Sequence, residues 1–174
     1  MGRLPSWGIG WYRKKFSVPA SDAGKSVYVE IDGAMSYAVV WLNGHLVGGW
    51  PYGYSSWQVD LTPYLEIGGE NQLAIRLDNP PSSSRWYPGG GIYRNVWLTK
   101  TQPVHVAQWG TQVTTRDVSA TAATIPVAVT IANDARGEER VQVATAIHEL
   151  DSDGLISPDA VAHLAPVELS IDAG

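Results

Sequence analysis

Residues 40–48 read VWLNGHLVG, and this stretch decides the local fold. Asn-Gly is the residue pair that most readily adopts positive φ at both central positions of a type I′ turn, which joins two antiparallel strands. Apolar residues dominate both flanks of the pair. We therefore predict a β-hairpin with strands at 37–42 and 45–48 and a turn at Asn43 and Gly44.

The alternation of apolar and polar residues continues on both sides of this hairpin. In residues 27–31, Val27, Val29 and Ile31 alternate with polar neighbours, which is typical of a strand with one buried face. Helical spacing is almost missing, although Thr62-Pro63 has the chemistry of a helix start that ends after about one turn. We predict strands at 11–18, 27–31, 57–61, 73–77 and 92–99, and loops at 48–56 and 79–91.

The character of the sequence changes near Gln102-Pro103. None of the 8 Trp lies beyond position 109, and the later strands, predicted at 125–131, 141–147 and 167–171, are small and β-branched. We therefore predict two domains, 1–102 and 103–174. The second is shorter than the roughly 100 residues of a complete immunoglobulin-like sandwich, so we expect it to be incomplete.

The aromatic composition is uneven, with 8 Trp and 8 Tyr against 1 Phe. Trp and Tyr carry polar atoms that need partners, so a chain that prefers them has rings that meet water, a polar ligand or another domain. Sugars are a natural candidate, because their C–H faces stack on rings while their hydroxyls take hydrogen bonds. The alternative is that large rings cap a wide sandwich.

Composition excludes several classes of function. The net charge is −5 and the 12 basic residues are scattered, so nucleic acid is not an expected partner. The absence of cysteine excludes disulfides and thiolate metal sites but leaves the compartment open. No apolar run is long enough to span a membrane, and residues 1–10 lack the core of a signal peptide.

Several motifs occur in a recognisable order. The most specific is SRWYPGGGIYRNVWL at 84–98. The others are GWYRKKF at 10–16, DGA at 32–34, VWLNGHLVG at 40–48, YGYSSW at 52–57, DLT at 60–62 and GENQLAI at 69–75. Together they resemble the N-terminal sugar-binding region of family 2 glycoside hydrolases of the β-galactosidase type.

The resemblance implies an all-β fold class: a galactose-binding-like jelly-roll β-sandwich at 1–102, followed by a truncated immunoglobulin-like β-sandwich at 103–174. In the family a (β/α)₈ barrel comes next and carries the chemistry. That barrel is the expected partner of this region and lies outside the sequence. The family often assembles into dimers or tetramers, so the full-length protein is a candidate homo-oligomer.

We expect no catalytic residue in this chain. A retaining glycosidase needs two carboxylic acids about 5 Å apart, whereas the acidic residues here fall at predicted strand ends and turns. We expect no cofactor and no metal, because the histidines are far apart in sequence and lack metal-ligand neighbours. They are His45, His105, His148 and His163.

The expected substrate-binding residues are Asn43, Arg85, Trp86 and Tyr87. The resemblance implies that the Asn43 hairpin and the loop before Gly-Ile-Tyr-Arg reach over the barrel mouth and help complete a galactose subsite. An Asn amide suits vicinal hydroxyls, although turn geometry alone also explains Asn43. No local structural feature explains why position 85 is an arginine. Larger members of the family carry an Asp near this position, and the departure puts in doubt the sodium site known there. Trp86, Tyr87 and the rings of 48–56 either stack on sugar or dock on the barrel.

Other polar and aromatic residues have structural explanations. Trp41 and Trp97 lie in predicted strands, where packing is the expected role. Arg94 follows Tyr93 within a predicted strand, and we expect it to pair with Asp32 or Asp60.

The leading hypothesis is a non-catalytic region of a retaining exo-β-galactosidase that binds a β-galactoside in the context of the full-length enzyme. One alternative is a free-standing lectin-like module. Another is the same region of a β-glucuronidase or β-mannosidase. The sequence leaves the glycoside, its linkage and the compartment open.

Overall fold

The computed structural model describes residues 8–82 and 89–174. Strands dominate it, and among the described residues the helical turns are two short 3-10 turns, η1 (Ala20–Asp22) and η2 (Thr62–Tyr64). The predicted all-β fold class is therefore confirmed. The chain divides into two compact units, Met1–Gln102 and Pro103–Gly174. No helix in the described ranges is long and apolar enough to cross a membrane.

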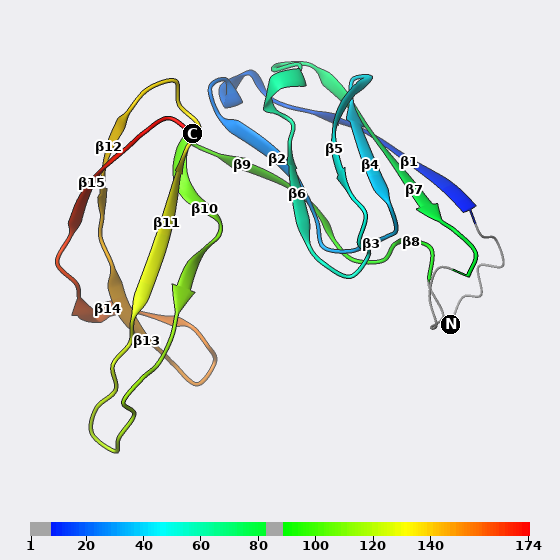
Figure 1. The fold of residues 1–174 in the computed structure, drawn as a ribbon. Coiled ribbons are helices and arrows are strands. Elements are labelled where there is room, and N and C mark those ends of the chain that lie inside the picture. Colours follow the sequence, from blue (N-terminus) through cyan, green and yellow to red (C-terminus); the bar gives the residue numbers. More distant parts are fainter. Residues whose placement is uncertain (1–7, 83–88) are drawn as a thin grey trace. The chain divides into compact units, whose positions relative to one another are not determined.

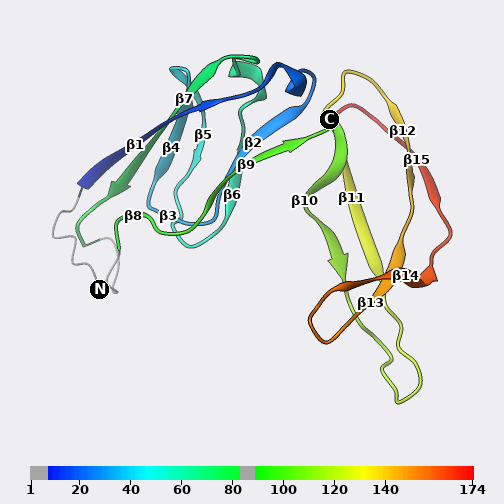
Figure 2. The same ribbon diagram turned by 180° about the vertical axis from the view of Figure 1, so that it is seen from behind.

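The first unit is a β-sandwich of two antiparallel sheets (Figures 1 and 2). One sheet has the strand order β1-β7-β4-β5 and the other has the order β6-β2-β9, while a short β3-β8 ladder closes one end. The strands are β1 (Gly8–Ser17), β2 (Ser26–Ile31), β3 (Ala34–Met35), β4 (Ala38–Leu42), β5 (His45–Trp50), β6 (Trp57–Asp60), β7 (Glu70–Asn79), β8 (Gly91–Ile92) and β9 (Val96–Thr101).

The core of this unit lies between the two sheets. The alternation predicted at 27–31 and 73–77 is confirmed, because every second side chain of β2 and β7 is buried. Val40 and Leu42 of β4 lie in the same cluster as Trp57 of β6, so both sheets contribute to one core. Each fully buried aliphatic side chain contributes about 1.5–3 kcal/mol.

The hairpin forms as predicted, but it is longer. Asn43 and Gly44 have φ of 51° and 86°, the positive values that a type I′ turn needs. β5 continues to Trp50, because Gly48 and Gly49 still pair with β4. The predicted loop at 48–56 was therefore too long at its start.

Two other local predictions need correction. The strand predicted at 92–99 is divided into β8 and β9, because the intervening amide of Tyr93 donates to the carbonyl of Gly33 rather than to a strand ladder. The short helix predicted at Thr62 is the 3-10 turn η2. The hydroxyl of Thr62 does not cap it and instead accepts a hydrogen bond from the amide of Val27 at 2.9 Å.

Asp22 joins distant parts of the first unit. Its carboxylate receives hydrogen bonds from Lys25 at 2.8 Å and from Lys100 of β9 at 2.5 Å. The Asp22 side chain is buried. The two ammonium groups hold its pKa below the ordinary value, and the hydrogen bond from Lys100 has the larger effect. The contact fixes η1 against the edge strand β9.

The second unit consists of three two-stranded antiparallel ladders, β10-β11, β12-β15 and β13-β14 (Figure 1). The strands predicted at 125–131 and 167–171 correspond to β11 and β15, whereas the one predicted at 141–147 is divided into β12 and β13. β10 was not predicted, and its pairing is interrupted by a register shift between Val106 and Thr111. The strands are β10 (Val104–Val113), β11 (Val127–Asn133), β12 (Glu139–Val143), β13 (Ala146–Leu150), β14 (Ile156–His163) and β15 (Val167–Ile171).

This unit does not enclose an apolar core. Across 103–174, all of which the structure describes, Asn133 is the single buried residue. Its amide donates to the carbonyls of Gly137 and Ile171, both at 2.9 Å, so it holds the ends of β11 and β15 together. Apolar side chains such as Ile156 remain 70% exposed. Backbone ladders, rather than apolar burial, hold this unit.

We predict that the stability of the first unit depends on the Asp22 carboxylate at neutral pH. Since the pKa of Asp22 is lowered from 3.8 in the folded chain, the stabilisation is complete above about pH 5 and is lost as the pH falls through the lowered pKa. The Asp22→Asn variant should have a lower urea midpoint than the wild type at pH 7, and the two midpoints should converge towards pH 3.

The matched control is Glu70→Gln, which removes the exposed pair between Lys15 and Glu70. It should change the midpoint little at any pH, because exposed pairs are screened by water. A difference between the wild type and Asp22→Asn that stays constant from pH 7 to pH 3 would contradict the assigned role.

We also predict that the two units differ in local stability within the 174-residue chain. Amides of β2, β4 and β7 lie over the apolar core and should exchange with deuterium slowly, whereas those of β12 and β15 should exchange at least about tenfold faster. Hydrogen exchange followed by mass spectrometry or NMR measures this. Equal protection of β7 and β15 would show that the second unit has a stabilising element other than a core.

Candidate functional site

The sequence-predicted residue Asn43 lies in the turn between β4 and β5. Its amide nitrogen donates to the carbonyl of Tyr64 and to Oδ1 of Asn71, both at 2.9 Å, and its Oδ1 accepts from the amide of Gln72 at 2.9 Å. Both amide protons are therefore engaged within the domain. These bonds explain Asn43 by its role in the turn. Its contact with a sugar at the barrel stays a prediction.

Asn71 explains why the turn is built this way. It is completely buried, its Oδ1 also accepts from the amide of Glu66, and its side-chain nitrogen donates to the Glu66 carbonyl. The two asparagines thus connect the hairpin to the segment between η2 and β7. The His45 ring stacks on Tyr64 at 4.4 Å and covers this end of the sandwich.

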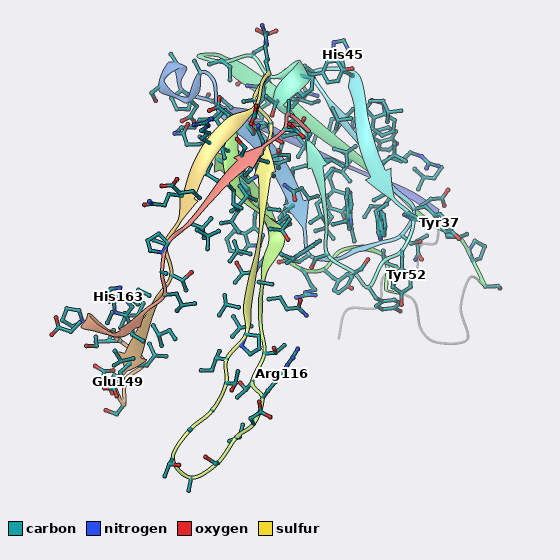
Figure 3. The ribbon with its side chains drawn as sticks, turned by 60° about the vertical axis from the view of Figure 1, so that its left-hand side comes forward. Tyr37, His45, Tyr52, Arg116, Glu149 and His163 are labelled. Atoms are coloured by element: carbon teal, nitrogen blue, oxygen red, sulfur yellow. The ribbon has the colours of Figure 1, made fainter. Side chains whose placement is uncertain are left out.

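Asn79 and Gly91, the described strand residues on either side of 85–87, lie at the other end of the sandwich. Asn43 neighbours Gln72 at the start of β7, whereas Asn79 ends the same strand. At roughly 3.3 Å per residue, about 23 Å separate Gln72 from Asn79. Figure 3 shows His45 at one end of this unit and Tyr37 and Tyr52 at the other. Asn43 and Asn79 therefore lie about a strand's length apart, and the expectation that the Asn43 hairpin and the loop before Gly-Ile-Tyr-Arg help complete one galactose subsite stays a prediction.

Exposed tyrosines gather at the end where β7 finishes. We call this set the aromatic rim, and each ring is at least 42% exposed. Tyr52 and Tyr54 contact each other edge to face with ring centroids 5.6 Å apart. Tyr37 was predicted to lie within the strand at 37–42. It instead precedes β4 and has a φ of 45°. The rim consists of Tyr12, Tyr37, Tyr52, Tyr54 and Tyr93.

Close backbone approaches hold the rim in place. The Tyr93 hydroxyl donates to the Gly53 carbonyl at 2.7 Å, and its ring lies where a Cβ on Gly33 would be only 2.7 Å from Cζ. On the other side, the amide of Ile92 donates to the hydroxyl of Tyr12 at 3.4 Å. Sequence reasoning missed Tyr12 and Tyr93; the glycines required by these contacts were the available signal.

Asp32 connects the rim loops to β9. Its carboxylate accepts from the Ser56 hydroxyl at 3.1 Å and from Nε1 of Trp97 at 3.0 Å, and its carbonyl accepts from Arg94 at 3.3 Å. Arg94 therefore bonds to the backbone of Asp32 rather than forming the expected ion pair. Trp97 is 53% exposed and is fixed by this hydrogen bond rather than by packing.

Arg85, Trp86 and Tyr87 lie outside the described residues, so their predicted contacts with substrate stay predictions. The described residues on either side, Asn79 and Gly91, are both at the rim end of the sandwich. No group of His, Asp and Glu that could hold a metal ion occurs within 8–82 and 89–174.

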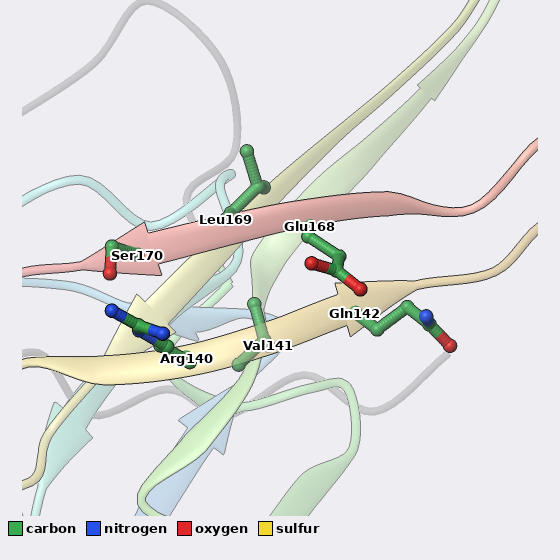
Figure 4. Close-up of a pocket in the computed structure, with 6 residues that line it drawn as sticks. All are labelled: Arg140, Val141, Gln142, Glu168, Leu169 and Ser170. Atoms are coloured by element: carbon green, nitrogen blue, oxygen red, sulfur yellow. The ribbon is translucent and has the colours of Figure 1, made fainter.

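A separate depression of about 420 Å³ runs along β12 and β15 in the second unit (Figure 4). Its lining mixes one cation, one carboxylate, an amide, a hydroxyl and two apolar chains. It belongs to an open two-stranded ladder, so we assign no ligand to it. The lining consists of the cross-strand pairs Arg140–Ser170, Val141–Leu169 and Gln142–Glu168.

The first unit matches a known class of domain. A family model described as the glycosyl hydrolase 2 galactose-binding domain-like domain matches residues 7–88. The first unit is thus a galactose-binding-like β-sandwich. The chain belongs to the glycosyl hydrolase 2 family.

Relatives and solved structures agree with this assignment. The chain is 48% identical over 151 residues to the β-galactosidase BoGH2A of Bacteroides ovatus, covering 86% of this chain and 18% of that protein. It is 32% identical over 177 residues to a β-glucuronidase of Formosa agariphila, covering 90% of this chain and 17% of that protein. A solved family 2 glycosyl hydrolase of Bacteroides cellulosilyticus superposes with a TM-score of 0.85 at 35% identity, covering 97% of this chain and 22% of the solved chain. The chain therefore spans less than a quarter of the length of these proteins.

We predict that Asn43 stabilises the turn. Asn43→Gly keeps the positive φ but removes three hydrogen bonds, and should lower the free energy of unfolding by about 1–3 kcal/mol. Asn43→Ala should lose about 1 kcal/mol more, because alanine is strained at this φ. Urea denaturation followed by tryptophan fluorescence measures both. An Asn43→Gly variant as stable as the wild type would show that the amide serves something other than the turn.

Proposed function

We propose that this chain is the non-catalytic sugar-facing region of a retaining exo-β-galactosidase. The observation that carries the proposal is the 48% identity, over 86% of the chain, to the β-galactosidase of Bacteroides ovatus. In this proposal the reaction takes place in a (β/α)₈ barrel outside this sequence. The first unit contributes a wall of the substrate subsite.

The contacts of the acidic side chains support a non-catalytic role. A retaining glycosidase needs two carboxyl groups about 5 Å apart that are free to reach the substrate. Here Asp22 is bound by two lysines and Asp32 by a hydroxyl and an indole. Asp60 accepts from the amide of Thr62 and Asp151 from that of Leu155. Each of these carboxylates is assigned to holding a turn or loop.

Within this function we assign the substrate contacts to Arg85, Trp86 and Tyr87. The described residues that flank them belong to the end of the sandwich that carries the aromatic rim. A guanidinium donates hydrogen bonds in a planar fork that suits neighbouring hydroxyls, and the two rings suit the C–H face of a sugar. The rim tyrosines then surround the same substrate or dock on the barrel.

A second candidate substrate is a β-glucuronide. The β-glucuronidase of Formosa agariphila matches 90% of this chain, and a solved family 2 β-glucuronidase superposes with a TM-score of 0.85 at 31% identity. Relatives of both names match this region, so the same sandwich occurs in both kinds of enzyme.

For the second unit we propose part of an immunoglobulin-like sandwich. Its three ladders carry alternating apolar residues, such as Val127, Val129 and Ile131, that remain only half-buried. In a complete sandwich such rows face a second sheet. Further chain from the same protein is the proposed cover.

The test uses a protein that carries this region together with its barrel. Replacing Arg85 by Ala should lower kcat/KM for an aryl β-galactoside about tenfold or more, because one hydrogen bond from a charged group to the sugar is lost. The 174-residue chain alone should release no product and should bind galactose with a dissociation constant of about 1 mM or weaker.

The matched control is Arg136→Ala, an exposed arginine of the second unit, which should leave kcat/KM unchanged. Unchanged kinetics in the Arg85 variant would remove Arg85 from the site. Faster turnover of an aryl β-glucuronide than of the galactoside would replace the first candidate by the second. Hydrolysis by the 174-residue chain, or micromolar galactose affinity, would refute the non-catalytic role.

A further inference from the structure

The outer face of the β1-β7-β4-β5 sheet contains a depression of about 340 Å³. We call it the Trp11–Trp41 depression. Its volume lies at the lower end of the range for small-molecule sites, roughly 300–1,000 Å³. It is lined by Trp11, Trp41, Asn43, Gly44, Gln72 and Ala74.

The strand register creates this depression. Ala74 of β7 pairs with Arg13 on one side and with Trp41 on the other, so a methyl group forms the floor between larger neighbours. Trp11 belongs to the next outward-facing position of β1, and its ring lies 5.2 Å from that of Trp41 at an interplanar angle of 35°. Two indoles therefore wall one side of a hollow with a small floor.

The indoles are held in place and accessible. Trp11 is 47% exposed, and the Arg13 guanidinium lies 5.1 Å from the centroid of its ring. A cation over an indole face is attracted to the ring and restricts its rotation. A ring that is already ordered loses little conformational freedom when a ligand stacks on it.

Polar groups at the end of the depression are free to bind a ligand. Within the part of the chain that the structure describes, the Gln72 side-chain amide has no hydrogen-bond partner, and the residue is exposed. Oδ1 of Asn43 accepts one hydrogen bond, from the Gln72 amide, and a carbonyl oxygen can accept two. Donors and acceptors thus lie beside the indole faces.

We propose that the Trp11–Trp41 depression binds one or two rings of a neutral β-linked oligosaccharide. The C–H face of a pyranose would stack on the indoles, and its hydroxyls would bond to Gln72 and to Oδ1 of Asn43. A neutral sugar is favoured because none of the six lining residues is ionisable. Of the nearby cations, Arg76 is paired with Asp78 at 3.0 Å, and the Arg13 guanidinium is engaged with the face of Trp11.

The neighbouring groove on the same sheet differs in a way that supports this choice. It measures about 320 Å³ and is lined mainly by apolar groups, including Val39, Leu46 and Trp50. Its polar side-chain groups are the Tyr37 hydroxyl and the Trp50 indole N–H, and it has no side-chain amide like that of Gln72. The indole of Trp50 already donates to Ser55 at 2.9 Å.

The proposed binding does not rest on the proposed catalytic role, because its residues belong to the outward-facing row of the sheet, and successive side chains of β1, such as Trp11 and the rim residue Tyr12, point to opposite faces. It would hold a polymeric or branched glycan near the enzyme without entering the reaction site. An assay of binding to the 174-residue chain therefore tests it separately from hydrolysis.

The experiment titrates the 174-residue chain with β-1,4-linked tetrasaccharides of galactose, glucose and mannose, and follows indole N–H signals by NMR. At least one probe should shift the signals of Trp11 and Trp41 with a dissociation constant of about 0.1–1 mM. The signal of buried Trp57 should stay unchanged. Trp11→Ala should weaken binding at least tenfold, and Gln72→Ala about fivefold to tenfold.

The matched control is Trp50→Ala, which removes another exposed indole of the same sheet and should leave the affinity unchanged. Should a tryptophan variant fail to fold, Gln72→Ala and Ala74→Leu, which fills the floor, still provide the test. The proposal is overturned by the absence of a shift for every probe at 10 mM, or by equal loss in Trp50→Ala. It is also overturned if Trp11→Ala abolishes self-association of the chain while no sugar binds, because the surface is then a protein contact.

Discussion

The architecture of the first unit depends on one constraint: the inward rows of its two sheets exclude water from a shared apolar core. β2 and β6 supply one side of that core, and β4 and β7 supply the other. Because side chains of a strand alternate between faces, committing one row to the core leaves the opposite row and the loops available for binding. The aromatic rim and the Trp11–Trp41 depression are both products of this division.

Polar side chains then fix what the core leaves unconstrained. Asn71 and Asn43 hold the hairpin end, Asp32 holds the rim loops, and Asp22 holds η1 to β9. Each of these side chains bonds to groups far away in sequence, and each lies where the chain leaves a regular ladder. A loop without backbone partners needs such contacts, because buried amides and carbonyls must be paired. The rings at the two ends therefore hold defined positions even though they are exposed.

The second unit shows what happens without that constraint. Its ladders are formed and its apolar residues alternate, yet they remain open to solvent, and Asn133 alone among its residues is buried. Hydrogen-bonded ladders contribute little net stability compared with an equivalent set bonded to water. The covering surface that we propose would convert these exposed rows into a core of the kind seen in the first unit.

Local patterns in the sequence were sufficient to predict the all-β class, the strands at 27–31 and 73–77, and the Asn43-Gly44 turn, because alternation and positive φ are properties of neighbouring residues. They could not show that β5 reaches Trp50 or that 92–99 is two strands, since both depend on pairing with distant segments. The same limit applies to the site. Asn43 was chosen for its chemistry, but only the tertiary structure places it about a strand's length from Asn79 and beside Trp11, Trp41 and Gln72. Which side chains share a surface is decided by strand order and register, and these are set by the packing of the whole core.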